Sequence, residues 1–225
     1  MSAATSRVAA TALVVLGLPV AASGQGLGVA FTGALALAEH RVADRSVGGG
    51  VEVSSGTLFS GGVRVRVGAR GAVALEGRSG VLHPGRGASL PRDLAELGVD
   101  GSYRMREWLD VIGGVRVRGY TTMLSRQRWT APYLGAAVRV PFVIPGLRGL
   151  LDVAVHPFAG VSGLARPEVA ITTGAGLAYA RGRLDVQVGY ALERYDFARA
   201  TVGERFEQLA VLTIQARVRA RGAVP

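Results

Sequence analysis

Hydrophobic and polar residues alternate with a period of two along most of the chain. The stretches from Val63 to Val67 and from Val115 to Arg118 alternate Val with Arg, and residues 184–190 repeat the pattern with other polar side chains. In an extended strand, this alternation puts the branched side chains on one face and the polar side chains on the other. The pattern therefore predicts an all-β chain.

Turn residues divide this pattern into ten predicted strands. They cover residues 27–38, 58–68, 72–83, 94–105, 109–121, 130–142, 148–160, 168–180, 183–195 and 206–220. Nearly all have 11 to 15 residues, whereas strands of globular proteins usually have about 5–6. A tilted strand that crosses a membrane needs about 9–11 residues, so the lengths favour membrane-crossing strands. Eight strands are the alternative, because residues 27–57 are loosely patterned.

Short and long connections alternate between these strands. Short turns are expected at 69–71, 106–108, 143–147 and 181–182, and longer polar connections at 39–57, 84–93, 122–129, 161–167 and 196–205. Short turns at one rim and long loops at the other are typical of bacterial outer-membrane barrels. Because an open sheet edge would leave backbone groups unpaired in lipid, the sheet must close. We predict a closed antiparallel up-and-down transmembrane β-barrel.

Most aromatic residues fall at the ends of the predicted strands, on the aliphatic face. Phe59, Tyr190 and Phe206 are expected near the long loops, Tyr103, Phe142 and Tyr179 near the short turns, and Trp108 and Trp129 at turn or loop edges. Aromatic belts that flank an aliphatic band are favoured at the two lipid–water interfaces. We therefore expect these eight side chains at the membrane interfaces.

The opposite face of the strands carries charges of both signs and is expected to line the barrel interior. Its charged residues are Arg64, Arg66, Glu76, Glu96, Asp100, Arg104, Asp110, Arg116, Arg118, Arg139, Asp152, Asp185, Glu193, Arg217 and Arg219. A small barrel has an interior that side chains can fill, and guanidinium groups bond carboxylates in a bidentate fashion. A packed network of Arg and carboxylate side chains is the main expectation, and a narrow anion-favouring pore is the alternative.

The first 24 residues resemble a secretory signal peptide. Arg7 is followed by an apolar stretch at 8–20 and by small residues at 21–24, which suit a signal peptidase. The apolar stretch is shorter than the roughly 20 residues of a membrane-spanning helix. We predict a cleaved signal peptide at residues 1–24, with cleavage after Ala22 as the alternative, and one barrel domain at residues 25–225.

Composition removes several kinds of chemistry. The chain has 225 residues, no Cys and a net charge of +10, and all 26 cationic residues are Arg. Without Cys there are no disulfides, thiolate metal sites or Cys nucleophiles. The three His residues lack a metal-binding spacing, and no nucleophile-elbow or phosphate-loop motif is present, so no metal, cofactor or catalytic residue is expected. The Arg residues alternate with lipid-type residues, which does not favour nucleic-acid binding.

With its signal segment, long alternating strands, alternating connections and rim aromatics, the chain resembles the small outer-membrane β-barrel proteins of Gram-negative bacteria, the OmpA/OmpX-like barrel-domain group. The resemblance covers residues 25–221. It implies residence in the outer membrane, contact with outer-membrane lipid and lipopolysaccharide, and insertion by the barrel-insertion machinery. Proteins of this kind usually end in an aromatic residue, whereas no aromatic follows Phe206 here.

We predict an integral, non-enzymatic outer-membrane barrel with a structural or narrow-pore role, and two other functions stay open. A soluble secreted β-barrel that binds a small apolar ligand would need the aliphatic face inside, because a period of two does not say which face is wet. An outer-membrane barrel hydrolase would use groups expected near the long loops. These groups are His40, His83, Asp44, Asp93 and Asp196.

Overall fold

The computed structural model describes residues 28–44, 50–197 and 205–220, so the predicted signal peptide at 1–24 lies outside the described residues. Within these ranges the chain forms strands. They are β1 (Gly28–Asp44), β2 (Val51–Val67), β3 (Gly71–Pro84), β4 (Arg92–Arg106), β5 (Leu109–Thr121), β6 (Arg126–Pro141), β7 (Leu147–Val155), β8 (Gly160–Val161), β9 (Pro167–Arg181), β10 (Leu184–Phe197) and β11 (Arg205–Arg219). The described residues include no helix that could cross a membrane.

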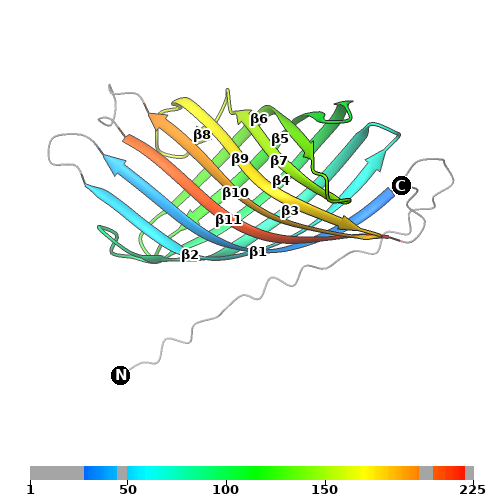
Figure 1. Ribbon diagram of the computed structural model, residues 1–225. Coiled ribbons are helices and arrows are strands. Elements are labelled where there is room, and N and C mark those ends of the chain that lie inside the picture. The colour runs from blue at the N-terminus through cyan, green and yellow to red at the C-terminus, as the bar shows by residue number, and fades with distance from the viewer. Residues whose placement is uncertain (1–27, 45–49, 198–204, 221–225) are drawn as a thin grey trace.

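The ten long strands form a closed antiparallel barrel (Figure 1). Each pairs with its neighbours in sequence, apart from the two-residue β8, and β1 pairs with β11 to complete the ring. β8 lies in the connection between β7 and β9 and pairs with β6, where Val161 is opposite Trp129. The predicted closed up-and-down barrel of ten strands is therefore confirmed.

The two rims of the barrel differ in their connections. The short-turn rim carries the connections 68–70, 107–108, 142–146 and 182–183. The start of β1 and the end of β11 lie at this same rim (Figure 1). The long-loop rim carries the described connections 85–91, 122–125 and 156–166. The difference rests on 85–91 and 156–166, because the connection 122–125 is shorter than 142–146 at the other rim. In outer-membrane barrels short turns face the periplasm and long loops face the outside, and we expect the same orientation here.

Two predicted boundaries are wrong for physical reasons. The predicted loop 39–57 is mostly strand, because β1 continues to Asp44 and β2 begins at Val51. These strands extend beyond the aliphatic band. There the outward Glu39 and Arg41 form an exposed ion pair of 3.5 Å. Polar outward side chains in this region therefore indicate a strand that is exposed to water, and not a loop. The predicted strand 148–160 ends at Val155. Pro157, which follows closely, has no N–H to donate to a neighbouring strand.

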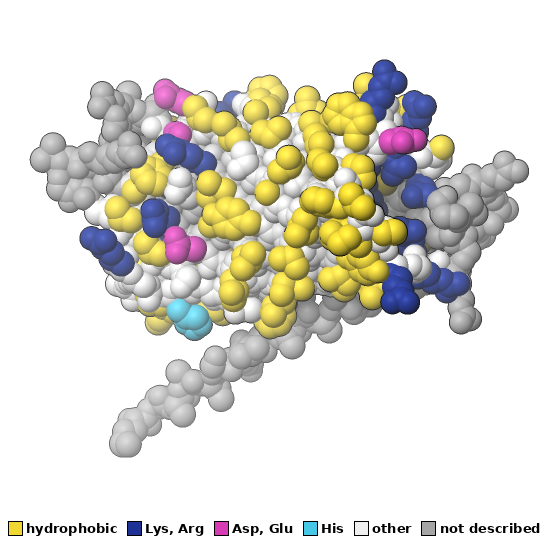
Figure 2. Space-filling view, viewed as in Figure 1, with side chains coloured by type: hydrophobic (Ala, Val, Ile, Leu, Met, Phe, Trp, Pro, Cys, Tyr) yellow, Lys and Arg dark blue, Asp and Glu magenta, His cyan; other side chains and the backbone are white. Residues whose placement is uncertain are grey.

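The outer surface of the barrel is aliphatic. Outward-pointing Leu35, Leu97 and Val188 are each about half exposed. Other outward aliphatic side chains, such as Leu75, Val115 and Leu151, are exposed to a similar extent. Figure 2 shows hydrophobic side chains over the middle of the outer face, with Arg side chains gathered toward both ends. The aliphatic face of the strands points outward and the charged face points into the barrel. The alternative of a soluble barrel with its aliphatic side chains inside is therefore wrong.

Seven of the eight predicted interface aromatics lie on the outside of the barrel or at its turns. Phe59, Tyr103, Trp108, Phe142, Tyr179 and Tyr190 are about half exposed, and Phe206 points outward with the Arg194 guanidinium 5.4 Å from its ring centroid. Trp129 is the exception, because it points into the barrel and is 2% exposed. β6 begins at Arg126 rather than at 130, so Trp129 falls within the alternation and shares the inward face with Tyr133 and Arg139.

Candidate functional site in the barrel interior

The upper part of the barrel interior, toward the long-loop rim, is filled by apolar and aromatic side chains that we call the apolar plug. Its members are Ala36, Ala38, Leu58, Leu82, Leu94, Tyr120, Trp129, Ala131, Ala159, Val161, Ala170, Tyr195, Phe197, Leu209 and Val211. Every long strand except β7 contributes to it, and Ala159, which follows β7, also does so. The sequence did not predict this plug, because it assigned Arg, carboxylates and small residues to the whole interior.

The apolar plug is tightly packed. Leu58, Leu82, Leu94 and Leu209 enter from four strands and are at most 1% exposed. The Trp129 ring lies between Tyr195 and Phe197, with centroid distances of 4.7 and 6.0 Å. Burying each such leucine contributes about 1.5–3 kcal/mol. Packing of this kind leaves these four side chains with almost no exposed surface.

Below the plug lies a group of five charged side chains, the five-charge cluster, formed by Arg78, Glu96, Arg116, Arg118 and Glu193. Arg118 bridges the two carboxylates, with Nε donating to Glu96 and Nη2 donating to Glu193, both at 2.5 Å. Arg78 bridges them too, through Nη2, at 3.0 Å to Glu96 and 3.1 Å to Glu193. The Arg116 guanidinium is 3.5 Å from Glu193. Three cations thus surround two carboxylates.

The five-charge cluster is joined to the apolar plug by two phenols. Tyr195 donates a hydrogen bond to Glu193 at 3.3 Å, and Arg118 Nη1 donates to the Tyr120 hydroxyl at 3.4 Å. These contacts satisfy polar atoms that the plug would otherwise bury without partners, a situation that costs about 1–3 kcal/mol for each atom. The plug and the cluster are therefore linked by hydrogen bonds, and a smaller cavity beside them is lined by members of both, such as Leu58 and Glu193.

Toward the short-turn rim the interior opens into a cavity of about 640 Å³, which we call the arginine cavity. Its charged lining residues are Arg64, Arg66, Arg70, Arg104, Glu107, Asp110, Arg116, Arg139, Arg148, Asp152, Asp185, Arg217 and Arg219. A second cavity of about 250 Å³ lies between it and the five-charge cluster, and Arg116 and Asp152 line both.

The fifteen predicted interior charges all lie inside the barrel. Ten of them line the arginine cavity, namely Arg64, Arg66, Arg104, Asp110, Arg116, Arg139, Asp152, Asp185, Arg217 and Arg219. Glu76, Glu96, Asp100 and Glu193 line the smaller cavity, and Arg118 is buried in the five-charge cluster. Their pairing crosses the barrel rather than following neighbouring strands alone, as the Arg118–Glu193 contact between β5 and β10 illustrates.

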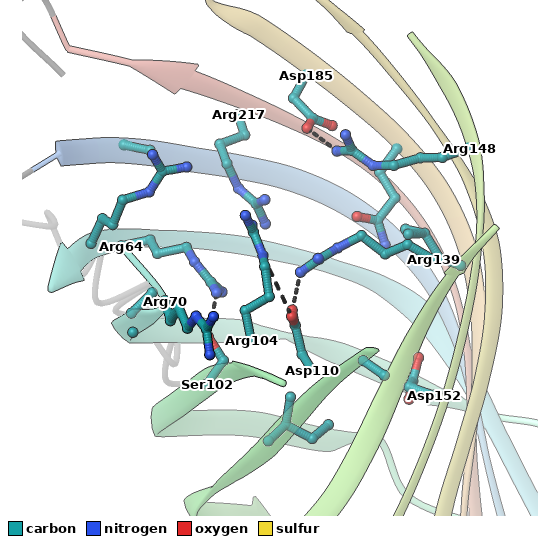
Figure 3. Close-up of a pocket in the computed structure, with 18 of the residues that line it drawn as sticks. Arg64, Arg70, Ser102, Arg104, Asp110, Arg139, Arg148, Asp152, Asp185 and Arg217 are labelled. Carbon is teal, nitrogen blue, oxygen red and sulfur yellow. Dashed lines mark hydrogen bonds and ion pairs between the residues drawn. The ribbon is translucent and has the colours of Figure 1, made fainter. Parts of the chain in front are cut away.

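Two arginines that complete this network were missed from the sequence. Arg78 pairs with Glu96 and Glu193, and Arg148 pairs with Asp185 (Figure 3). Both signals were present in the alternation, because Arg78 shares the parity of Glu76 on its strand and Arg148 shares that of Asp152. Extending the parity rule to every charge of each strand would have found them.

A separate polar cluster lies near the long-loop rim. His40 Nε2 is 3.4 Å from Glu207 Oε2, and Arg92 Nη1 is 3.2 Å from His40 Nδ1. The His40 ring stacks on Tyr120 at a centroid distance of 4.5 Å, and His40 is only 2% exposed. Arg205 donates to the other oxygen of Glu207. The cluster is enclosed by these contacts and joins the upper edge of the apolar plug.

The five groups proposed for a hydrolase do not meet in one site. His40 points inward, whereas His83 and Asp93 are exposed on the outer face. Asp196 also points outward and pairs with Arg194 at 3.0 Å, and the side chain of Asp44 lies outside the described residues. The described residues contain no group of three or more His or acidic side chains that could hold a metal ion.

Comparison with known proteins gives matches in structure only. The sequence matches no protein-family model and no curated protein. The outer membrane protease OmpT from Escherichia coli superimposes with a TM-score of 0.57 at 10% identity, covering 88% of this chain and 98% of that one. The translocator domain of the autotransporter NalP from Neisseria meningitidis gives 0.43 at 11% identity, covering 87% and 89%. Neisserial surface protein A gives 0.36 at 14% identity, covering 84% and 97%.

The first of these similarities corrects the expectation of a non-enzymatic barrel. A protease has the same ten-stranded fold, so this fold gives no ground for excluding catalysis. The identity of 10% shows a shared fold and carries no activity over to this chain. With its closed ring of long strands, its aliphatic outer surface and this shared fold, the chain has the fold of an outer-membrane β-barrel.

Proposed function

We propose that the chain is a structural barrel of the outer membrane whose lumen is sealed, rather than a narrow pore. The observation that carries this proposal is the apolar plug, to which nine of the ten long strands contribute a buried inward side chain. A pore needs a continuous polar path through the barrel, as the water-filled lumen of porins provides. Here the cavities that begin at the short-turn rim end against the five-charge cluster and the plug residues Ala36, Leu58 and Val211.

The charged interior supports the same proposal. Arg118, Glu96 and Glu193 are buried and bonded to one another at 2.5 Å. A buried ion pair of this kind resists opening, because removing one partner leaves an uncompensated buried charge at a cost of about 3–5 kcal/mol. The network thus acts as packing that holds the strands together, and an ion that crossed it would have to displace these contacts.

We propose outer-membrane lipid and lipopolysaccharide as partners of the outer surface, and the barrel-insertion machinery as the partner during assembly. The support lies in outward arginines above the aliphatic band at the long-loop rim. Arg41, Arg126, Arg128 and Arg194 are all exposed there. In the outer leaflet this level faces the phosphate groups of lipopolysaccharide, which guanidinium groups bind strongly.

Conductance across a planar bilayer tests the sealed lumen. The wild-type barrel is expected to give no unit steps. A variant with Arg118→Ala, Trp129→Ala and Tyr195→Ala removes the largest side chains of the plug and the bridging guanidinium, and should conduct. The matched control is Trp108→Ala, Tyr179→Ala and Arg181→Ala, which changes the same residue types outside the interior. Folding of each variant is checked by gel migration with and without boiling. Stable steps from the wild-type barrel would overturn the proposal.

A further inference from the structure

The arginine cavity carries more positive charge than its own side chains neutralise. Nine arginines and four carboxylates line it. It opens at the short-turn rim, because its lining includes the turn 69–71, Glu107 and the first residues of β1. Its volume of about 640 Å³ lies within the range of roughly 300–1,000 Å³ typical of small-molecule sites.

Two of the four carboxylates of the cavity, Asp110 and Asp185, are already engaged by its arginines. Asp110 accepts a hydrogen bond from Arg139 and is 3.9 Å from the Arg104 guanidinium, and Asp185 accepts from Arg148 (Figure 3). Three cations therefore share two acids. The remaining positive charge of the cavity has no matching negative charge among these pairs.

Arg64 and Arg217 line the cavity and form no hydrogen bond to a carboxylate among the described residues, although Asp185 lies opposite Arg217 in the register of β10 and β11. Arg64 Nη2 donates to the neutral hydroxyl of Ser102 at 2.5 Å rather than to a carboxylate. The Nε of Arg217 is buried and has no hydrogen-bond partner among the described residues. A buried donor without an acceptor is unfavourable, so an acceptor supplied from outside would be stabilised there.

These guanidinium groups point toward one another. Figure 3 shows Arg64, Arg104, Arg139 and Arg217 reaching from β2, β4, β6 and β11 into the same space. Like charges that converge in a partly enclosed space attract a counter-ion more strongly than isolated surface charges do. The planar fork of guanidinium matches the oxygens of a phosphate group, and several forks can bind one polyvalent anion.

We infer that the arginine cavity is a binding site for a small polyvalent oxyanion of the phosphate class, entering from the short-turn side. Arg64 and Arg217 supply donors that are not hydrogen-bonded to a carboxylate among the described residues, and Arg104 and Arg139 complete the ring. A free phosphate compound and the phosphate of a lipid headgroup share this chemistry. Binding requires no passage through the barrel, so it is independent of whether the plug conducts.

Isothermal titration calorimetry of the folded protein in nonionic detergent at low ionic strength tests this inference, with inorganic pyrophosphate as the probe. We expect saturable binding by the wild-type protein. The double variant Arg64→Gln and Arg217→Gln should bind about a hundredfold more weakly, because each charge-assisted hydrogen bond contributes roughly tenfold or more. The control is Arg106→Gln with Arg181→Gln, two exposed arginines near the short-turn rim that do not line the cavity. It changes the net charge equally and should bind like the wild type.

Three further outcomes decide the inference. No saturable binding of either pyrophosphate or the lipid probe named below to the wild-type protein, or an equal loss in both double variants, would overturn it. If the cavity variant does not fold, Arg217→Lys is used instead, because it keeps the charge but loses the planar guanidinium group. Its affinity for pyrophosphate should lie between those expected for the wild-type protein and the double variant. Monomeric dihexanoylphosphatidylglycerol is the second probe: binding of this lipid without binding of pyrophosphate would assign the site to a lipid phosphate.

Discussion

Arg118 and Glu193 are joined across the interior of the barrel by a hydrogen bond of 2.5 Å, although β5 and β10, which carry them, are not neighbours. The same guanidinium donates to Glu96 on β4. One side chain thus ties three strands together at the level where the polar interior meets the apolar plug. This contact makes the five-charge cluster part of the packing that holds β4, β5 and β10 together, although four of its members also line the smaller cavity.

Replacing Arg118 with Ala is expected to destabilise the barrel by about 3–5 kcal/mol, because two buried carboxylates lose their bridging cation. Unfolding of the detergent-solubilised protein in urea, followed by the fraction that migrates as a folded band, measures the change. The exposed pair of Arg194 with Asp196 provides the control, and Arg194→Ala should change the stability by less than about 1 kcal/mol. Equal effects of the two substitutions would contradict a structural role for the cluster.

Leu82→Ala is expected to cost about 2–5 kcal/mol, since it leaves a cavity inside the apolar plug. Leu82 is 0% exposed, whereas Leu97 on the neighbouring strand points outward and is 56% exposed. Leu97→Ala removes the same atoms from the lipid-facing surface and should cost clearly less. The same urea titration compares them, and a larger loss for Leu97 would mean that the interior is not packed as described.

Substitution of Arg126 and Arg128 by Gln should weaken the binding of lipopolysaccharide roughly fivefold, because each exposed ion pair contributes about 0.2–1 kcal/mol. Both side chains are outward and exposed at the start of β6. Binding is measured by titration of lipopolysaccharide into the solubilised protein, and added salt should reduce it further. Arg106 and Arg181, replaced by Gln at the opposite rim, give the control. Unchanged affinity in the Arg126 and Arg128 variant would remove these residues from the proposed contact.

N-terminal sequencing of the protein recovered from membranes tests the predicted signal peptide. Cleavage after Gly24 leaves Gln25 as the first residue of the mature chain. The small side chains of Ala22 and Gly24 suit the peptidase pocket, and a tryptophan at either position should block processing and leave the longer precursor. A mature chain that begins at Met1 would show that the segment is not removed.

Much of the fold follows from the alternation of residues, because the period of two is set by backbone geometry. Once the strands were placed, the parity of Arg64, Asp110 and Arg217 was enough to put them inside. The partners were not predictable, since Arg118 reaches a residue 75 positions away on a strand that is not its neighbour. Such pairing depends on the barrel diameter and on the reach of each side chain.

Two features could not be predicted for a different reason. The apolar plug lies where both faces of a strand are apolar, as Leu58 and Phe59 illustrate. The alternation of apolar and polar residues is absent there, so it cannot distinguish inward from outward side chains. The upper part of β1 has the outward polar side chains of Glu39 and Arg41, and β2 has those of Ser55 and Thr57, which resemble a loop in sequence. Only the pairing between the strands, such as His40 opposite Ser54, shows that the sheet continues above the lipid.

The central prediction is that the aliphatic face of the barrel lies in lipid. Cell fractionation followed by gel migration tests this prediction most directly. The protein should appear in the outer-membrane fraction. After extraction in detergent, the unboiled sample should migrate differently from the boiled one, because a closed ring of paired strands resists unfolding by detergent alone. A protein that stays in the soluble periplasmic fraction and shows no shift on boiling would contradict the account.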